Sequence, residues 1–95
     1  MKPVYNKATP LPTTTKEYVE FEQMVNFQVG ESVRVIRTAR TYEGGWNNSW
    51  NSDMDAYIGN TYEVDSTGRP DGSGITLDMF RFPYFVLERV LREEG

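Results

Sequence analysis

The sequence contains neither cysteine nor histidine. Without cysteine the chain can form no disulfide and no thiolate metal site, and without histidine it lacks the commonest nitrogen ligand of metals and the usual general base at neutral pH. In addition, no pair of carboxylates has a spacing typical of an acid and a base, and no serine or threonine has an evident partner base. We therefore predict that the protein is not an enzyme and uses no cofactor and no metal.

Long apolar runs are also missing. The first residues, MKPVYNKATPLPTTT, hold no apolar stretch of signal-peptide length, and no run of about eighteen apolar residues occurs anywhere in the chain. We expect a cytoplasmic protein that does not bind membranes. The net charge of −4 opposes attraction to phosphate backbones, so nucleic acid is a possible but disfavoured partner.

Aromatic residues, in contrast, are abundant. They make up 14% of the 95 residues, although the mean hydropathy is only −0.61. A chain of this length suits one small core, and each buried aromatic ring supplies more apolar area than an aliphatic side chain. A few aromatic residues can therefore form that core.

The basic residues divide the chain into two parts. All lysines lie in the first sixteen residues, whereas all arginines lie from Arg34 onward. We place a boundary near Val29, between an N-terminal arm (residues 1–28) and a folded part (residues 29–95). The stretch ATPLPTTT (residues 8–15) favours extended backbone, so the first dozen residues are expected to be loosely ordered.

Two patterns compete in the rest of the arm. Thr14 and Glu17 fit a helical capping box, and Tyr18, Phe21 and Val25 recur at helical spacing. Apolar residues also alternate along residues 19–29, as in extended chain. We favour a short helix within residues 14–25 followed by extended chain, and the extended alternative stays open.

Short strands are predicted beyond residue 30. Residues 32–39 (SVRVIRTA) place Val33 and Val35 on one face, residues 60–66 and 74–78 suggest a hairpin with a wide turn, and residues 79–82 (MFRF) continue the pattern. Residues 84–91 suit a last strand or a short helix. Between them, residues 40–58 contain a glycine pair, three asparagines and little periodicity, which predicts a long loop.

This order of elements resembles the SH3-like small barrel. Residues 57–59 (YIG) match the step that follows the long first loop of that family, and residues 82–87 (FPYFVL) match its 3₁₀ turn before the last strand. The resemblance implies a mainly all-β fold, namely a five-stranded SH3-like barrel over residues 29–95, preceded by an N-terminal arm that can hold a short helix.

Together with Trp46, Trp50 and the pair Met54-Asp55, these motifs are also similar to small SH3-like proteins encoded by phages. That resemblance implies an accessory protein that engages a host or defence factor in the host cytoplasm. The sequence departs from peptide-binding SH3 domains, because the acidic run of their long loop is reduced to Glu43, Asp53 and Asp55 and their tryptophan pair is missing. A polyproline ligand is therefore not expected.

Aromatic and acidic residues of the long loop are the candidate contacts for a protein partner. Exposed aromatic side chains serve as anchors at protein interfaces, and carboxylates can bind the arginine or lysine side chains of a partner. Two alternatives stay open: some of the aromatic residues fold into the core, and the carboxylates are simply solvated. The predicted partner-binding residues are Tyr42, Glu43, Trp46, Trp50, Asp53, Asp55, Tyr57 and Tyr84.

Two other functions compete with protein binding. Arg34, Arg37, Arg40 and Arg81 could form a basic strip beside aromatic rings that stack on bases, although we favour ion pairs between these arginines and the acids of the same region. Alternatively, open strand edges could pair with copies of the chain in an assembly, and the oligomeric state is left open.

Overall fold

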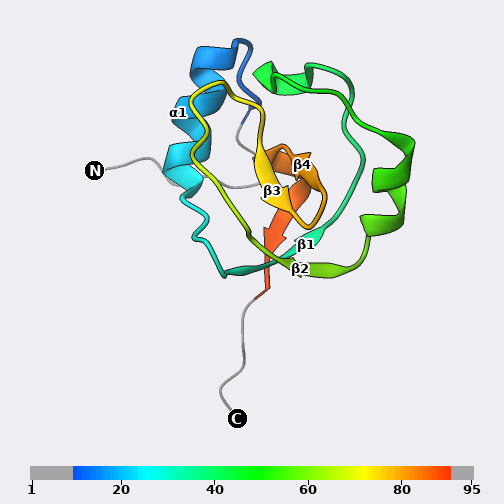
Figure 1. The fold of residues 1–95 in the computed structure, drawn as a ribbon. Coiled ribbons are helices and arrows are strands. Elements are labelled where there is room, and N and C mark those ends of the chain that lie inside the picture. The colour runs from blue at the N-terminus through cyan, green and yellow to red at the C-terminus, as the bar shows by residue number, and fades with distance from the viewer. Residues whose placement is uncertain (1–9, 91–95) are drawn as a thin grey trace.

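The computed structural model describes residues 10–90, which fold around one α-helix and five short strands (Figure 1). These are α1 (Thr15–Val25), β1 (Ser32–Val35), β2 (Thr61–Glu63), β3 (Ile75–Leu77), β4 (Phe80–Phe82) and β5 (Leu87–Arg89). Three short 3₁₀ helices lie in the connections: η1 (Glu43–Gly45), η2 (Ser52–Tyr57) and η3 (Tyr84–Val86). In Figure 1, α1 lies on one side of the molecule and the segment with η2 curves around the other.

The strands form two separate antiparallel sheets. One sheet has the order β2-β1-β5, with Val33 opposite Tyr62 on one side and Arg89 on the other. The second is the β3-β4 hairpin, in which Leu77 pairs with Phe80 across the turn. The strands occur where alternation predicted them, and the Pro83 corner leads through η3 into β5.

The expected all-β barrel is wrong. Within residues 10–90 the two sheets do not close on each other, and the chain also contains a helix, so the fold is mixed in content. Four of the strands have only three residues, and a single bridge between Ser66 and Thr76 joins the second sheet to the segment that follows β2. The expected hairpin of residues 60–66 with 74–78 is accordingly reduced to that bridge.

Of the two alternatives for the arm, the helix is confirmed. The Thr14 hydroxyl accepts a hydrogen bond from the N–H of Glu17 (3.1 Å), and the Glu17 carboxylate accepts from the N–H and hydroxyl of Thr13 (3.2 and 2.7 Å). These bonds satisfy backbone donors that have no partner within a helix. The helix ends at Asn26, which takes the left-handed conformation (φ 57°).

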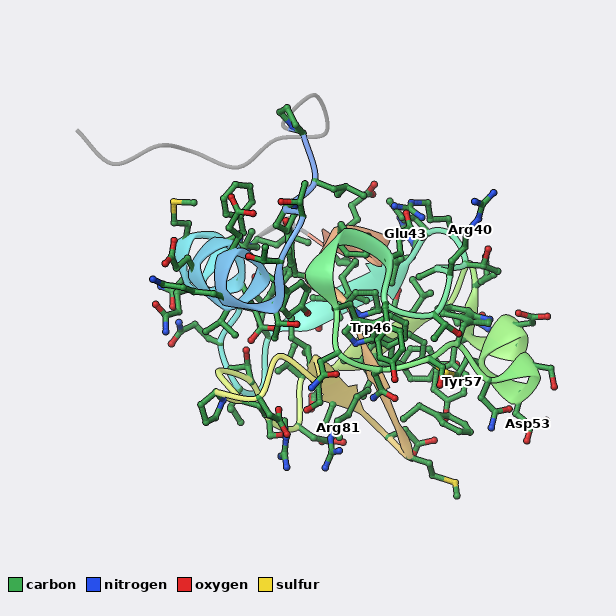
Figure 2. All side chains as sticks on the ribbon, turned by 90° about the horizontal axis from the view of Figure 1, so that it is seen from above. Arg40, Glu43, Trp46, Asp53, Tyr57 and Arg81 are labelled. Atoms are coloured by element: carbon green, nitrogen blue, oxygen red, sulfur yellow. The ribbon has the colours of Figure 1, made fainter. Side chains whose placement is uncertain are left out.

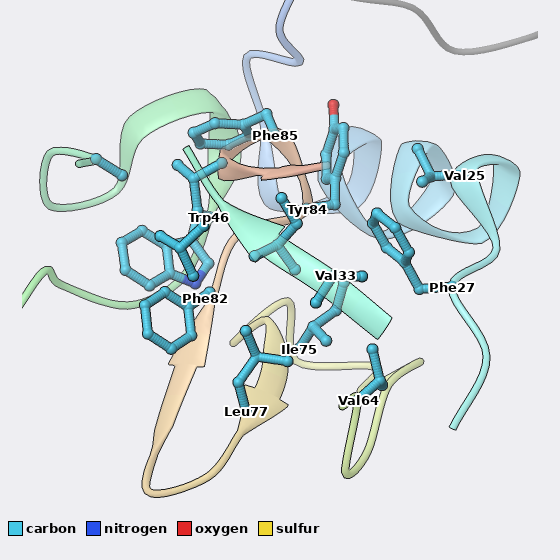
Figure 3. Packing of buried hydrophobic residues seen from close by; sticks show 14 of the residues in the cluster. Val25, Phe27, Val33, Trp46, Val64, Ile75, Leu77, Phe82, Tyr84 and Phe85 are labelled. Carbon is cyan, nitrogen blue, oxygen red and sulfur yellow. The ribbon is translucent and has the colours of Figure 1, made fainter. Parts of the chain in front are cut away.

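The helix packs into the same core as the sheets (Figure 3). Tyr18 is fully buried and contacts Tyr84, with the ring centroids 5.2 Å apart. Val33, Trp46 and Phe82 are also fully buried, so the core combines helix, long loop and both sheets.

The expectation of a loosely ordered start falls mostly on residues 1–9, which lie outside the described residues. Within the described part, Pro12 is already buried and Leu11 packs against the core. Separately, no helix in residues 10–90 is both long and apolar enough to cross a membrane.

Candidate aromatic binding face

Three of the predicted contact residues lie in the core. Trp46 and Tyr84 are fully buried and Tyr57 is 9% exposed. The indole N–H of Trp46 donates to the carbonyl of Ser73 (2.8 Å), so the ring is held inside by packing and by a hydrogen bond. Trp46 and Tyr84 therefore offer no ring to a partner, which corresponds to the core alternative left open by the sequence.

The predicted residues at the start of the loop lie apart from the others. Tyr42 is exposed and its backbone is left-handed (φ 59°). The Glu43 carboxylate accepts a hydrogen bond from the N–H of Arg40 (2.9 Å) and forms an ion pair with Arg37 (3.2 Å). Glu43 thus holds the loop in shape, and no described aromatic ring stacks on Tyr42.

A cluster of aromatic rings does reach the surface around Tyr57. Tyr62 stacks on Tyr57 with the ring centroids 4.6 Å apart, and Phe80 packs edge-on against Tyr57 with the centroids 5.6 Å apart. Trp50 packs edge-on against Phe82 at 5.6 Å, and Phe82 itself lies 5.2 Å from Tyr57. Trp50, Tyr62 and Phe80 are only partly buried, and we call these three residues, with Tyr57 beneath them, the aromatic face.

Two of the four residues of this face, Tyr62 and Phe80, were missed by the sequence analysis. Alternation places Tyr62 on the same face as Val64, and Phe80 on the same face as Phe82. Val64 and Phe82 are indeed buried, but Tyr62 and Phe80 are half-covered. Alternation gives the side of a strand on which a residue lies, and it contains no signal for how far the core extends along that side.

Carboxylates border the aromatic face and are bonded to its rings. Asp55 accepts a hydrogen bond from the indole N–H of Trp50 (2.6 Å), and Asp78 accepts one from the Tyr57 hydroxyl (2.7 Å). Burial and the Asp78 carboxylate both raise the pKa of Tyr57, so its hydroxyl stays protonated and remains a donor. These bonds fix the rings in place from their polar ends.

The carboxylates continue beyond the rings. Asp65 accepts from the backbone N–H of Asp78 (2.9 Å), and Asp53 lies exposed in the first turn of η2, where the Asn51 side chain accepts from its N–H (2.8 Å). Met79, at the tip of the β3-β4 turn, is 80% exposed. The rim of the face is therefore acidic, with one exposed apolar side chain.

A shallow groove of about 320 Å³ runs along one side of the face. It is lined by residues 48–51, by Met54, and by Phe80 and Arg81 of β4. Trp50 and Phe80 thus belong both to the groove and to the aromatic face.

The arginines do not form the strip that the nucleic-acid alternative needs. Arg34 pairs with Glu88 (3.6 Å) and Arg37 with Glu43 (3.2 Å), so two of the four positive charges face carboxylates. Arg40 and Arg81 lie at opposite sides of the molecule (Figure 2). These arginines therefore offer no continuous basic surface along which a phosphate backbone could bind.

The buried ionisable pair serves the fold. The Glu22 carboxylate accepts hydrogen bonds from the Tyr18 hydroxyl (2.8 Å) and the N–H of Gly68 (3.1 Å), and burial raises its pKa. The groove beside the aromatic face does not reach this pair. Within residues 10–90, no group of three His, Cys, Asp or Glu side chains is placed to hold a metal ion.

Comparison with known proteins adds no further assignment. No family model, no curated protein and no solved structure matches this chain.

Proposed function

We propose that the protein is a non-enzymatic binding module that contacts a protein partner through the aromatic face. The observation that supports this most directly is the partly exposed set Trp50, Tyr62 and Phe80, whose rings each pack on the buried ring of Tyr57 or Phe82. Aromatic side chains of this kind provide most of the binding energy at many protein interfaces.

The rigidity of the face favours binding. Ring stacking and the hydrogen bonds to Asp55 and Asp78 hold the aromatic side chains in one arrangement before any partner arrives. Ordering a mobile side chain at an interface costs free energy, about 0.5–1.5 kcal/mol for each one. Side chains that are already ordered avoid most of this cost.

The acidic rim indicates the class of partner. Asp53, Asp55, Asp65 and Asp78 place negative charge around the face, which repels phosphate backbones and favours proteins over nucleic acids. A polar rim around an apolar centre is also the usual composition of a protein interface.

The biological setting is a separate part of the proposal. The resemblance of the sequence to small phage proteins suggests an accessory protein that engages a host or defence factor in the host cytoplasm. Nothing in the aromatic face itself distinguishes such a factor from another protein.

The experiment is an affinity capture from cell lysate, quantified by mass spectrometry, with the double variant Trp50→Ala/Phe80→Ala beside wild type. Tyr42→Ala is the matched control, because Tyr42 is an exposed aromatic residue away from the face. Both variants keep Trp46, whose buried indole reports folding by fluorescence. We expect a protein that wild type and Tyr42→Ala capture and that the folded double variant loses.

Two results would contradict the proposal. One is equal capture by the folded double variant and by wild type, which would place the contact elsewhere. The other is capture of nucleic acid alone that persists at high salt, because the acidic rim predicts that any such binding is weak and is lost as salt rises.

A further inference from the structure

Strand β4 has one edge that no other described strand covers. It pairs only with β3, and in that pair Arg81 lies opposite Thr76. The N–H of Thr76 bonds to the carbonyl of Ser66 (2.9 Å), and its carbonyl accepts from the N–H of Asp65 (2.8 Å). Both backbone groups of Thr76 therefore point away from β4.

This arrangement fixes the direction of the backbone groups of Arg81. In an antiparallel pair, two opposite residues either bond to each other or both point their N–H and C=O groups outward. Since Thr76 points outward, Arg81 does so too, at the uncovered edge of β4. No described residue forms a hydrogen bond with its N–H or its C=O. A donor and an acceptor are thus available there at the spacing of a strand.

The uncovered edge borders the groove beside the aromatic face. Residues 48–51, which also line the groove, have extended backbone at Asn51 (φ −95°, ψ 140°). The N–H of Trp50 also forms no hydrogen bond within the described part of the chain. A groove lined by a strand edge and by a segment with an unbonded backbone donor is suited to an extended peptide.

The side chains of β4 indicate what that peptide must carry. Successive residues of a strand point to opposite faces, so Phe80 and Phe82 lie on the side of Tyr57 and Arg81 lies on the other. Arg81 is exposed, and in residues 10–90 it forms no ion pair. An added strand with a carboxylate opposite Arg81 gains charge-assisted contact, and its neighbouring residues then face the rings.

One carboxylate of the protein already lies near this arginine. The pKa of Asp71 is lowered, first by hydrogen bonds from Ser73 and further by Arg69 and Arg81. The positive charges of two arginines therefore act on this one carboxylate, which leaves net positive charge on this side of β4. The acidic rim, in contrast, lies on the side of the rings.

We propose that the outer edge of β4 accepts an extended segment of a partner protein as an additional antiparallel strand, with an aspartate or glutamate opposite Arg81 and apolar residues on both sides of it. The proposal rests on the proposed function, because the groove is part of the same binding face. It adds the mode of binding and the pattern of the partner, apolar–acidic–apolar.

The first test uses a synthetic peptide, acetyl-Ser-Ile-Glu-Ile-Ser-amide, titrated into isotope-labelled full-length protein by NMR. We expect shifts centred on the backbone N–H of Arg81 and the indole N–H of Trp50. Methylation of the backbone nitrogen of the peptide's glutamate should weaken binding at least about tenfold. The methyl group removes the hydrogen bond from this nitrogen to the Arg81 carbonyl and leaves that carbonyl unsatisfied. Lysine in place of the glutamate should weaken it about tenfold by repulsion from Arg81.

Two variants of the protein test whether the backbone N–H and the side chain of Arg81 bind the peptide. Arg81→Pro removes the outward N–H and keeps the bonds to β3, and proline is tolerated where the N–H faces away from the sheet. It should abolish peptide binding. The matched control, Arg81→Val, keeps the N–H, and it should still bind the peptide but lose the preference for glutamate over lysine.

Several results would overturn the proposal. These are no binding of the peptide at millimolar concentration, equal binding of the methylated peptide, or unchanged binding to folded Arg81→Pro. If Arg81→Pro does not fold, the comparison of the methylated with the unmethylated peptide on wild-type protein tests the proposal. Shifts at Arg81 that appear on raising the concentration of the protein alone would assign the edge to a second copy of the chain instead.

The two proposals can fail separately. If Trp50→Ala/Phe80→Ala loses its captured partner while Arg81→Pro retains it, the aromatic face binds a protein without strand addition. If neither variant loses the partner, both proposals are wrong.

Discussion

Trp46 and Ser73 are joined by a hydrogen bond across 27 residues of sequence. The indole N–H donates to the Ser73 carbonyl (2.8 Å), and the side-chain amide of Asn48 donates to the same oxygen (3.2 Å). The long loop is thereby fastened to the segment that enters β3. An apolar ring with one polar atom suits this position, because the ring fills the core while the N–H satisfies a carbonyl.

Replacement of Trp46 by alanine should lower the free energy of unfolding by about 3–5 kcal/mol, since it removes a fully buried ring and leaves a cavity. Trp50→Ala is the matched control and should cost about 1–2 kcal/mol, because Trp50 is partly exposed. Urea denaturation followed by far-ultraviolet circular dichroism measures both values. Equal losses for the two tryptophans would contradict the assignment of Trp46 to the core and Trp50 to the surface.

Local pattern was sufficient to locate α1 and β1. The capping signal of Thr14 and Glu17 marked the start of α1, and the alternation of Val33 with Val35 marked β1. Both signals act over a few residues, and local backbone geometry decides them. Element positions could therefore be read from the sequence.

Closure of the sheets could not be read in the same way. Closure depends on contacts between segments far apart in sequence, such as residues 64–74, which pair with β3 only through the bridge between Ser66 and Thr76. Deciding which of the two loop tryptophans is buried posed the same difficulty. Trp46 and Trp50 have similar surroundings of Asn, Gly and Ser in the sequence, and only the distant carbonyl of Ser73 distinguishes the buried one.

Glu22 should make stability depend on pH in an unusual direction. Burial raises the pKa of its carboxyl in the folded state above the ordinary value of 4.5, so folding favours the protonated form. Stability from this group is fully present below about pH 4.5 and declines as pH rises through the raised pKa. The carboxyl of Asp71, with its lowered pKa, acts in the opposite direction and at lower pH.

The variant Glu22→Gln isolates this effect. We expect the difference in unfolding free energy between wild type and Glu22→Gln to shift in favour of the variant as pH rises above 4.5. Denaturation curves at a series of pH values measure that difference, and Glu20→Gln is the control because Glu20 is an exposed glutamate of the same helix. A difference that stays constant with pH would show that Glu22 titrates normally.

Gly45 is required by a close approach of the loop to the start of α1. Its backbone is left-handed (φ 79°), and a Cβ there would overlap the carbonyl of Thr14. We expect Gly45→Ala to destabilise the protein by about 2–5 kcal/mol, which combines backbone strain with overpacking.

Gly59 provides the matched control for that prediction. It is also left-handed (φ 86°), but nothing lies within 4 Å of a Cβ at this position. Gly59→Ala should therefore cost only the strain, about 1–2 kcal/mol. Thermal melts of both variants measure the difference, and equal shifts would mean that η1 does not press against the helix start.

Arg89 holds the end of α1 to β5. Its guanidinium donates to the carboxylate of Glu31 (2.6 Å) and to the carbonyls of Val25 and Asn26, and it lies over the ring of Phe27 at 4.6 Å. The two carbonyls belong to the last turn of the helix, where backbone acceptors lack helical partners.

Loss of this guanidinium should loosen the end of the helix. Arg89→Ala should cost about 1–3 kcal/mol, since it removes several charge-assisted hydrogen bonds at once. Arg34→Ala should cost less than about 1 kcal/mol, because the pair of Arg34 with Glu88 is exposed and longer (3.6 Å). Urea denaturation compares the two, and amide exchange should become faster at Val25 and Asn26 only in Arg89→Ala. Equal costs, with unchanged exchange at these residues, would mean that Arg89 is an ordinary surface ion pair and that packing alone holds the helix end.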